Sequence, residues 1–200
     1  MKRRSPMKVL GLTGGVGMGK STAAQMLRTR GVQVVDTDDL ARHLVEPGES
    51  ALVEIKKEFG DEIIAASGGL NRGELARIVF ADVAARKKLE AILHPRIRQS
   101  WLTQVELWRR GDCRLAAVVI PLLFETQATP QFDKVICVAC SAGNQRKRLS
   151  ERGWTATQIR QRIAAQMPVE QKVTRADFIL WTDGDLIAHT QQIERILSKI

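Results

Sequence analysis

The sequence has 200 residues, of which 44% are hydrophobic and 26% charged, a balance typical of a globular chain with a sizeable core. No apolar run approaches the roughly 20 residues that a membrane-spanning helix needs. The chain begins with the basic stretch MKRRSP, but too few apolar residues follow it for a secretory signal. We therefore expect a cytoplasmic protein in which residues 7–200 fold and residues 1–6 form a disordered leader.

The net charge of +9 is concentrated in two segments. Residues 85–114 carry eight basic and three acidic side chains, and residues 143–175, which include Lys172, carry eight basic and two acidic ones. Such patches suit nucleic acid, or equally a substrate with several phosphates. Only 4% of the residues are aromatic, so a stacking platform for single-stranded nucleic acid is poorly supported.

Short apolar runs alternate with stretches of helical periodicity along the chain. Strands are predicted over KVLGLT, GVQVVDTD, CRLAAVVIPLLFE, KVICVACS and ADFILWTDG, which cover residues 8–13, 31–38, 113–125, 134–141 and 176–184. Helices are predicted over residues 19–30, 39–46, 50–59, segments of 72–110, and from Leu186 to Ile200. Strands separated by helices predict an α/β fold, with a mostly parallel sheet and helices on both faces.

The stretch between the second and third predicted strands is helical and too long for a simple crossover. We predict that residues 48–110 form an inserted helical subdomain on the substrate side. His94 precedes Pro95 inside this pattern, which predicts a kink. A buried, hydrogen-bonded His94 and a ligand-contacting His94 both remain open.

A glycine-rich loop follows the first predicted strand. Gly14-x-x-x-x-Gly19-Lys20-Ser21 matches the phosphate-loop pattern G-x-x-x-x-G-K-[ST] without a mismatch, between a strand and a helix. Glycines let backbone N–H groups converge on phosphate oxygens, and the helix N-terminus adds positive potential. We expect Lys20 to reach the β- and γ-phosphates, Ser21 to ligate Mg²⁺, and Thr22 to add a hydroxyl near the α-phosphate.

The segment CVAC has the CxxC spacing of redox and zinc sites. It lies, however, in an apolar run typical of a buried strand, where Cys137 and Cys140 would point to opposite faces. We therefore favour a structural role for both cysteines.

A phosphate loop predicts a nucleotide site but not a reaction. The DxxG and NKxD motifs of GTPases do not occur, and the chain is short for a motor or transporter ATPase, so a small-molecule kinase fits better. Such an enzyme needs a carboxylate beside the acceptor hydroxyl, and Asp36 and Asp38 lie at the carboxyl end of the second predicted strand. They would share a face if the strand continues. Alternatively, Asp38 or Thr37 caps the next helix, and Asp39 is a solvated side chain.

Seven segments resemble the dephospho-CoA kinase family and occur in that family's order along nearly the whole chain: LTGGVGMGKST, VVDTDDLAR, LEAILHPRI, VIPLLFE, NQRKRLSERG, RIAAQMP and ADFILWTDG. The resemblance implies ATP-dependent phosphorylation of the ribose 3′-hydroxyl of dephospho-CoA, which gives CoA and ADP. It also implies a phosphate-loop kinase fold with a nucleotide core, a helical CoA-side domain and a helical lid over residues 143–168.

The same resemblance implies site residues. Catalytic roles fall on Asp38, the family's presumed general base, and on Lys20 and Arg148. ATP contacts fall on the phosphate loop and the lid: Gly15, Gly17, Met18, Gly19, Lys20, Ser21, Thr22 and Arg148. Substrate contacts fall on Asp36, Asp38, His94 and Gln166, and a metal contact falls on Ser21.

Three positions depart from the family pattern. Met18 replaces a usual serine, and we expect its side chain to point away from phosphate. Thr37 replaces a common alanine. The segment WTDG lacks an asparagine that usually precedes the final turn, so the adenine contact around residues 182–184 stays open.

The residues leave several alternatives open. Glu125 either packs with the core or assists at the site, and at most one of Arg160 and Arg162 points inward. Thr155 and Gln158 predict a capping box at a helix start. Two other functions are compatible with the sequence: a kinase for a nucleoside or nucleoside monophosphate, and a nucleotide-gated nucleic-acid-binding protein, which would explain the high pI.

Overall fold

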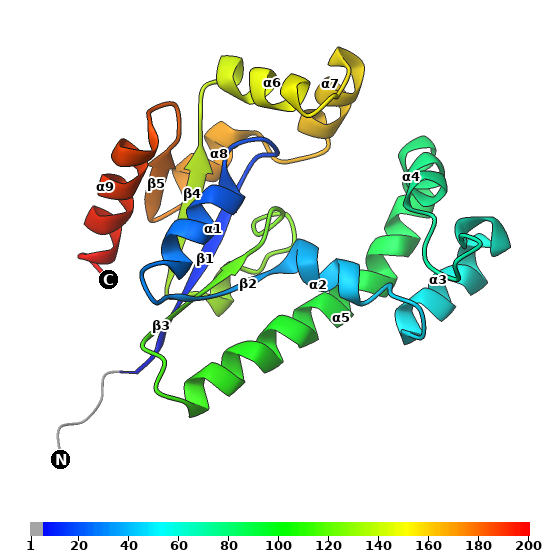
Figure 1. The fold of residues 1–200 in the computed structure, drawn as a ribbon, viewed down its shortest axis with the longest axis horizontal. Coiled ribbons are helices and arrows are strands. Elements are labelled where there is room, and N and C mark those ends of the chain that lie inside the picture. Colours follow the sequence, from blue (N-terminus) through cyan, green and yellow to red (C-terminus); the bar gives the residue numbers. More distant parts are fainter. Residues whose placement is uncertain (1–5) are drawn as a thin grey trace. The chain divides into compact units, whose positions relative to one another are not determined.

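The computed structural model describes residues 6–200 as a sheet flanked by helices (Figure 1). The strands are β1 (Lys8–Gly14), β2 (Gln33–Asp36), β3 (Leu115–Val119), β4 (Lys134–Ala139) and β5 (Phe178–Trp181). The helices are α1 (Lys20–Arg28), α2 (Thr37–His43), α3 (Ser50–Phe59), α4 (Arg72–Ala81), α5 (Val83–Arg110), α6 (Ala142–Glu151), α7 (Ala156–Ala164), α8 (Val169–Arg175) and α9 (Leu186–Leu197). Residues 1–5 of the predicted leader lie outside the described residues.

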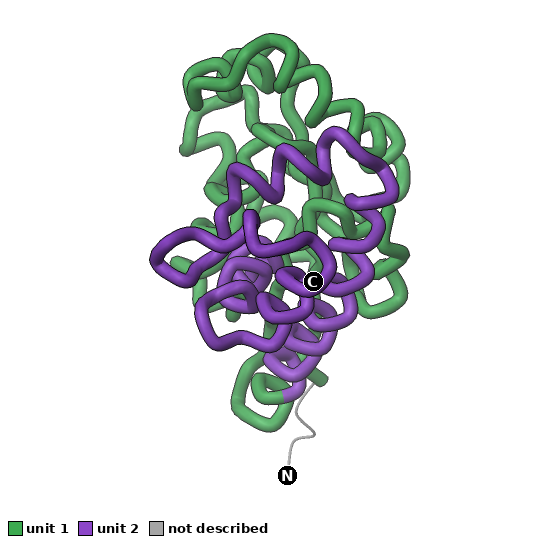
Figure 2. Tube along the Cα trace, turned by 90° about the vertical axis from the view of Figure 1, so that its right-hand side faces the viewer, with its two compact units in different colours: residues 1–35, 107–200 green, residues 36–106 purple. Residues whose placement is uncertain are grey.

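The chain divides into two compact units (Figure 2). The first unit, green in Figure 2, contains the chain up to Val35 and again from Leu107 to Ile200. The second unit, purple, is the helical stretch Asp36–Glu106. It begins earlier than the predicted insertion over residues 48–110, so it also includes α2.

The five strands lie in the order β2-β3-β1-β4-β5, so β1 is the central strand. It pairs in parallel with β3, where Leu10 lies opposite Ala117, and with β4, where Leu12 lies opposite Ile136. The predicted parallel α/β sheet is therefore confirmed. Because ligands of such sheets bind at the carboxyl ends of the strands, the residues after Gly14 are in the position that a ligand site requires.

Alternate residues of β1 face two different layers. Leu10 and Leu12 belong to a buried cluster with Leu27 of α1 and Ile193 of α9. On the other side, Thr13 Oγ1 donates to the carbonyl of Pro121 at 3.2 Å, and α8 packs against β1 and β4. Helices therefore cover both faces of the sheet, as the sequence predicts.

The third strand is shorter than predicted. It ends at Val119, and one more ladder bond joins the Ile120 N–H to the Leu12 carbonyl at 2.9 Å. Pro121 has no N–H to continue the ladder, and the chain turns, with the Leu123 N–H donating to the Ile120 carbonyl. Leu123 is buried, so the apolar character of residues 121–125 reflects core packing after the strand rather than the strand itself.

The last helix buries only part of its predicted apolar face. Ile193 and Ile196 are buried, whereas Leu186 in the first turn is 61% exposed. The periodicity predicts which face is apolar, but it does not predict how far along the helix the core extends.

At the outer edge of strand β5, the backbone of Trp181 forms hydrogen bonds with a side chain, that of Gln192. The N–H of Trp181 donates to Gln192 Oε1, and Gln192 Nε2 donates to the carbonyl of Trp181, both at 2.9 Å. Gln192 lies on α9, so this amide ties the helix to the outer strand of the sheet.

The second unit has a core of its own. Buried residues from α3, α4, α5 and their connections form one cluster: Val45, Ala51, Ile55, Ile63, Leu75 and Ile92. Helix α5 runs through Pro95 as one element, so the His94-Pro95 step does not end the helix.

Candidate functional site

The glycines of the loop between β1 and α1 shape its backbone. Gly14 has φ of +146°, and a Cβ on it would lie 2.2 Å from the carbonyl oxygen of Val138. Gly19, with φ of +94°, is the N-cap of α1 and has no side chain to cover the first N–H groups of that helix. The loop therefore presents backbone donors at a helix N-terminus, which is the arrangement that binds phosphate.

Lys20 lies across this loop. Its Nζ donates to the carbonyls of Gly14 and Gly15, at 3.0 and 2.9 Å. The next two residues, Ser21 and Thr22, are exposed in the first turn of α1. An ammonium and two hydroxyls are thus placed beside the N–H groups of the loop.

Met18 contributes its backbone to the loop and its side chain to the core. The side chain is 2% exposed and clusters with Ala139 and Cys140. Its carbonyl accepts a hydrogen bond from Thr182 Oγ1 at 2.9 Å. The Met18 side chain therefore packs against the end of β4, and its backbone carbonyl joins the loop to the residue after β5.

Arg148 on α6 reaches the loop through Thr182. The guanidinium donates to the Thr182 carbonyl and, at 2.9 Å, to Thr182 Oγ1, which in turn donates to Met18. Thr182 is 3% exposed. Thr182 thus links the predicted lid arginine to the phosphate loop.

Two glutamines bracket a single residue of the phosphate loop. The Val16 N–H donates to Gln166 Oε1 at 2.9 Å, and Gln145 Nε2 donates to the Val16 carbonyl at 2.8 Å. Gln166, predicted to contact substrate, is therefore bonded to the loop in this structure. Gln145 was not predicted, although it shares a helix face with buried Leu149 four residues later.

The start of α6 is fixed by Asp183, which follows β5. Its carboxylate accepts from the Ser141 N–H at 2.9 Å and from Asn144 Nδ2 at 2.8 Å. The Asn144 hydrogen bond is the main cause that lowers the pKa of Asp183, and bonds from Ser141 add to it. The first turn of the predicted lid is therefore tied to the end of the sheet.

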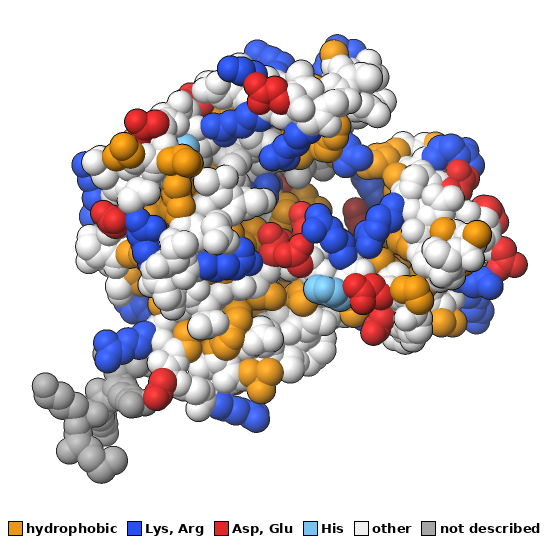
Figure 3. Space-filling view, viewed as in Figure 1, with side chains coloured by type: hydrophobic (Ala, Val, Ile, Leu, Met, Phe, Trp, Pro, Cys, Tyr) orange, Lys and Arg blue, Asp and Glu red, His pale blue; other side chains and the backbone are white. Residues whose placement is uncertain are grey.

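The second helix of the predicted lid begins with the predicted capping box: the Thr155 N–H donates to Gln158 Oε1 at 2.9 Å, and the Gln158 N–H donates to Thr155 Oγ1 at 3.3 Å. Arg162 lies over the ring of Trp154, with 4.4 Å between the guanidinium carbon and the ring centroid. Lys and Arg side chains gather along α6 and α7 at the top of Figure 3.

Lys172 departs from the predicted basic surface because it is fully buried. Its Nζ lies 2.8 Å from Glu125 Oε1 and donates to the Pro121 carbonyl at 2.7 Å. Glu125 Oε1 also accepts from the Met167 N–H at 2.9 Å. The sequence leaves a role of Glu125 at the site open. It gives no sign of the pairing with Lys172, because a lysine in a short polar helix is typical of a solvated face.

The cysteines of the CVAC segment are buried free thiols. Burial raises the pKa of Cys137 to about 11, although the charges of Lys172 and Lys20 act in the opposite direction. Burial also raises the pKa of Cys140. Both are therefore protonated at neutral pH, which agrees with a structural role.

Asp36 and Asp38 do not alternate along one strand, because β2 ends at Asp36 and α2 begins at Thr37. Asp36 is the N-cap of α2, and its Oδ1 accepts from the Asp38 N–H at 2.9 Å. The alternative that Asp38 or Thr37 caps this helix is therefore wrong. Asp38 is exposed in the first turn, and Asp39 pairs with Arg42 on the surface at 2.9 Å.

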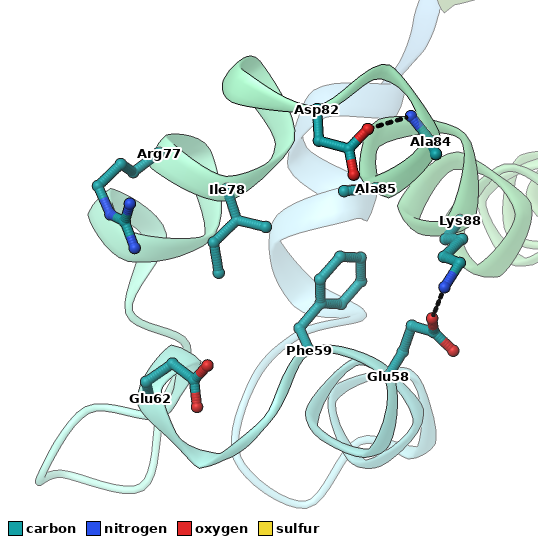
Figure 4. Close-up of a pocket in the computed structure, with 9 residues that line it drawn as sticks. All are labelled: Glu58, Phe59, Glu62, Arg77, Ile78, Asp82, Ala84, Ala85 and Lys88. Carbon is teal, nitrogen blue, oxygen red and sulfur yellow. Dashed lines mark hydrogen bonds and ion pairs between the residues drawn. The ribbon is translucent and has the colours of Figure 1, made fainter.

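His94 is exposed on α5, which excludes the buried alternative. The second unit also holds a pocket of about 360 Å³, in which Phe59 and Ile78 face each other (Figure 4). Its rim carries three carboxylates and two cations, one of which, Lys88, pairs with Glu58 at 2.6 Å. The lining residues are Glu58, Phe59, Glu62, Arg77, Ile78, Asp82, Ala84, Ala85 and Lys88.

Comparison with known proteins identifies relatives that match nearly the whole chain. The family model described as dephospho-CoA kinase matches residues 8–188. A dephospho-CoA kinase of Bdellovibrio bacteriovorus is 42% identical over 191 residues, which are 96% of this chain and 95% of the relative. The solved structure of TT1252 from Thermus thermophilus is 32% identical with a TM-score of 0.83 and covers 98% of this chain and 99% of its own. A dephospho-CoA kinase from Campylobacter jejuni is 25% identical with a TM-score of 0.70, covering 96% of both chains.

Proposed function

The chain belongs to the dephospho-CoA kinase family, which phosphorylates dephospho-CoA to CoA with ATP, and on that basis we propose the residues that carry the reaction and the hydroxyl that it modifies. The phosphoryl group is transferred to the ribose 3′-hydroxyl of dephospho-CoA. The observation that carries the proposal is the loop from Gly14 to Thr22, where a helix N-terminus without a side-chain cap and the Lys20 ammonium lie together.

In this mechanism the first unit binds the triphosphate. The N–H groups at the start of α1 bind phosphate oxygens, and Lys20 exchanges its hydrogen bonds to the Gly14 and Gly15 carbonyls for bonds to the β- and γ-phosphates. Arg148 leaves Thr182, or shares its five donors with it, to stabilise charge on the transferred group. The hydrogen bonds from Lys20 and Arg148 to the phosphate oxygens strengthen in the transition state, because negative charge builds up on those oxygens as the phosphoryl group is transferred.

The donors present fit a magnesium–triphosphate complex. Ser21 is an exposed hydroxyl in the first turn of α1, and the described residues contain no cluster of three or more His, Cys, Asp or Glu side chains that could enclose a metal. Ser21, together with phosphate oxygens and water, would therefore hold Mg²⁺. When bound there, Mg²⁺ would supply positive charge that offsets the negative charge of the phosphate groups.

The second unit supplies the acceptor side. Asp38 is exposed at the start of α2, and its backbone is fixed by the Asp36 carboxylate. A carboxylate there accepts a hydrogen bond from the ribose hydroxyl and orients it for in-line attack. Because little proton transfer has occurred in a loose transition state, Asp38 acts mainly by positioning. Asp36, His94 and Gln166 remain our proposed substrate contacts.

The test is acceptor specificity. ADP formation is measured with ATP, Mg²⁺ and one acceptor at a time: dephospho-CoA, AMP or uridine. We expect turnover with dephospho-CoA alone and a product phosphorylated at the ribose 3′-oxygen, as seen by mass spectrometry and NMR. Turnover with AMP or uridine but not with dephospho-CoA would contradict the proposal.

We further propose that the basic surface serves phosphorylated small molecules rather than nucleic acid, and that the protein acts in the cytoplasm. The three free cysteines suit a reducing compartment. No helix within residues 6–200 combines the length and apolarity needed to cross a membrane. DNA and RNA titrations at several salt concentrations test the first point, since a nucleic-acid-binding protein would show a steep salt dependence.

A further inference from the structure

A closed ring of contacts begins and ends at the phosphate loop. Thr13, the residue before Gly14, donates to the Pro121 carbonyl, and that carbonyl also accepts from Lys172. Lys172 pairs with Glu125, whose Oε1 accepts from the Met167 N–H. The neighbouring Gln166 returns to the loop by accepting from the Val16 N–H. Residues 13 and 16 are thus joined both by the loop itself and by this ring.

The pair at the centre of the ring is poorly suited to a purely stabilising role. Lys172 is fully buried and the Glu125 side chain is only 23% exposed, so both charges lose most of their hydration. Burying an ion pair usually costs as much free energy as the attraction returns, and apolar replacements are often equally stable. In addition, Glu125 Oε2 is buried and has no hydrogen-bond partner among the described residues, which is itself destabilising.

The position of the pair indicates what it does instead. Each member bonds to a different part of the site: Lys172 to the turn that holds the end of β1, and Glu125 to the backbone at the trailing end of the predicted lid. We expect loss of either bond to let Val16, and with it the loop backbone, shift relative to Met167. Phosphoryl transfer depends strongly on such placement, because misplacement by about 1 Å can cost roughly 100-fold in rate.

We propose that Lys172 and Glu125 are positioning residues for phosphoryl transfer, which hold the phosphate loop and the trailing end of the lid in one arrangement. This inference rests on the proposed function, because it assigns the pair to the rate of that reaction. Neither side chain needs to touch ATP or the acceptor. The pair acts through Thr13, Met167 and Gln166.

The experiment compares the full chain with Lys172→Met and with the double variant Glu125→Gln/Lys172→Met. The single variant leaves a buried carboxylate without its cation, so it alone could fail to fold. The double variant removes both charges and keeps an amide oxygen for the Met167 N–H, but it breaks the link to Pro121. Lys134→Met is the matched control, since Lys134 makes an exposed ion pair of the same length, 2.8 Å, with Asp177.

We measure kcat and KM for ATP, thermal unfolding, and hydrogen exchange at the Val16 and Met167 amides. For the double variant we expect a Tm within about 5 °C of the parent. We expect kcat to fall by about 10–100-fold while KM for ATP changes by less than about 3-fold. Exchange at Val16 and Met167 should rise by about tenfold. The control Lys134→Met should match the parent in kinetic constants, in Tm and in hydrogen exchange at both amides.

A double variant with the parent's kcat would overturn the proposal, and so would unchanged exchange at both amides. A double variant that does not fold would also overturn it, because the pair would then be a requirement of folding. If the parent itself forms no ADP with dephospho-CoA, the proposed function fails separately. The exchange data need no substrate, and they then decide whether the pair holds the lid end to the loop.

Discussion

Three candidate residues of the phosphate-loop unit and two of the inserted helical unit differ in what their side chains contact. In the first unit, Lys20, Arg148 and Gln166 are each bonded to backbone groups of the loop or of Thr182. In the second unit, Asp38 and His94 are exposed. The predicted phosphate contacts Lys20 and Arg148 would therefore exchange hydrogen bonds within the protein for bonds to a ligand. The predicted acceptor contacts Asp38 and His94 would exchange bonds to water instead.

The two units also differ in how their basic side chains are paired with carboxylates. In the pocket of the second unit, Arg77 and Lys88 are paired with Glu74 and Glu58, and these contacts raise the pKa of both cations. With Glu62 and Asp82 also on the rim, this pocket disfavours phosphate. The predicted phosphate contacts Lys20 and Arg148 lie instead in the first unit, where Lys and Arg side chains also gather along α6 and α7 (Figure 3).

The largest effect should come from the acceptor side. We expect Asp38→Asn to lower kcat by about 10²–10⁴-fold, because the hydroxyl loses the carboxylate that orients it. ATP affinity, measured by calorimetry, should be nearly unchanged since Asp38 is not a phosphate contact. Asp39→Asn is the control, an exposed neighbour paired with Arg42. Parent-like turnover in Asp38→Asn would remove this residue from the chemistry and leave the second unit without its main candidate.

Lys20→Ala should impair both ATP binding and phosphoryl transfer. Loss of the ammonium removes charge stabilisation in the transition state and a contact in the bound state, so kcat should fall by about 10²–10³-fold and ATP should bind more weakly. Steady-state kinetics and calorimetry measure the two effects, and a thermal melt checks the fold. Unchanged kinetics would refute the loop assignment.

Arg148→Ala should have a smaller effect, a loss of about 10–100-fold in kcat/KM for ATP, as expected for one charge-assisted hydrogen bond. Arg146→Ala, on the exposed side of the same helix, is the matched control and should retain activity. Equal losses in both variants would show that the lid acts through general positive charge rather than through the arginine held by Thr182.

The last prediction concerns stability instead of activity and involves Cys137, which is buried in β4. Because the pKa of Cys137 is raised to about 11, its contribution to stability is full below its ordinary pKa of 9.0 and is lost as the pH rises through about 11. The loss amounts to about 2–3 kcal/mol. The free energy of unfolding of the parent, measured in urea, should therefore fall more between about pH 8.5 and about pH 10.5 than that of Cys137→Ala. Cys113→Ala should follow the parent, and identical pH profiles for all three would contradict the assignment.

The sequence predicts the phosphate loop and the parallel sheet well, because both depend on local patterns. The loop needs glycine at positions such as Gly14, where any side chain would meet a neighbouring strand. The Thr155–Gln158 capping box is equally local. In contrast, the end of β2 at Asp36 depends on a competition between strand and helix over adjacent polar residues, and there the prediction placed the cap wrongly.

The contacts that the sequence does not predict join residues far apart in the chain. Lys172 and Glu125 are 47 positions apart (172 minus 125), and Gln145 lies 129 positions from Val16. Nothing in a polar helix shows that one of its lysines will be buried, because burial depends on where α8 packs. Such pairs become visible only when the sheet order brings their elements together.

Gln192 gives the outer strand a substitute neighbour. Its amide offers one acceptor and one donor to Trp181, as the peptide group of an adjoining strand would. The side chains of Ile179 and Trp181 are exposed at this edge, but the backbone hydrogen-bonding groups of Trp181 are already used. A strand from another molecule would have to displace the Gln192 amide to pair with β5 there. The backbone groups of Trp181 are thus already bonded within the chain, at an edge where free groups would pair with another strand.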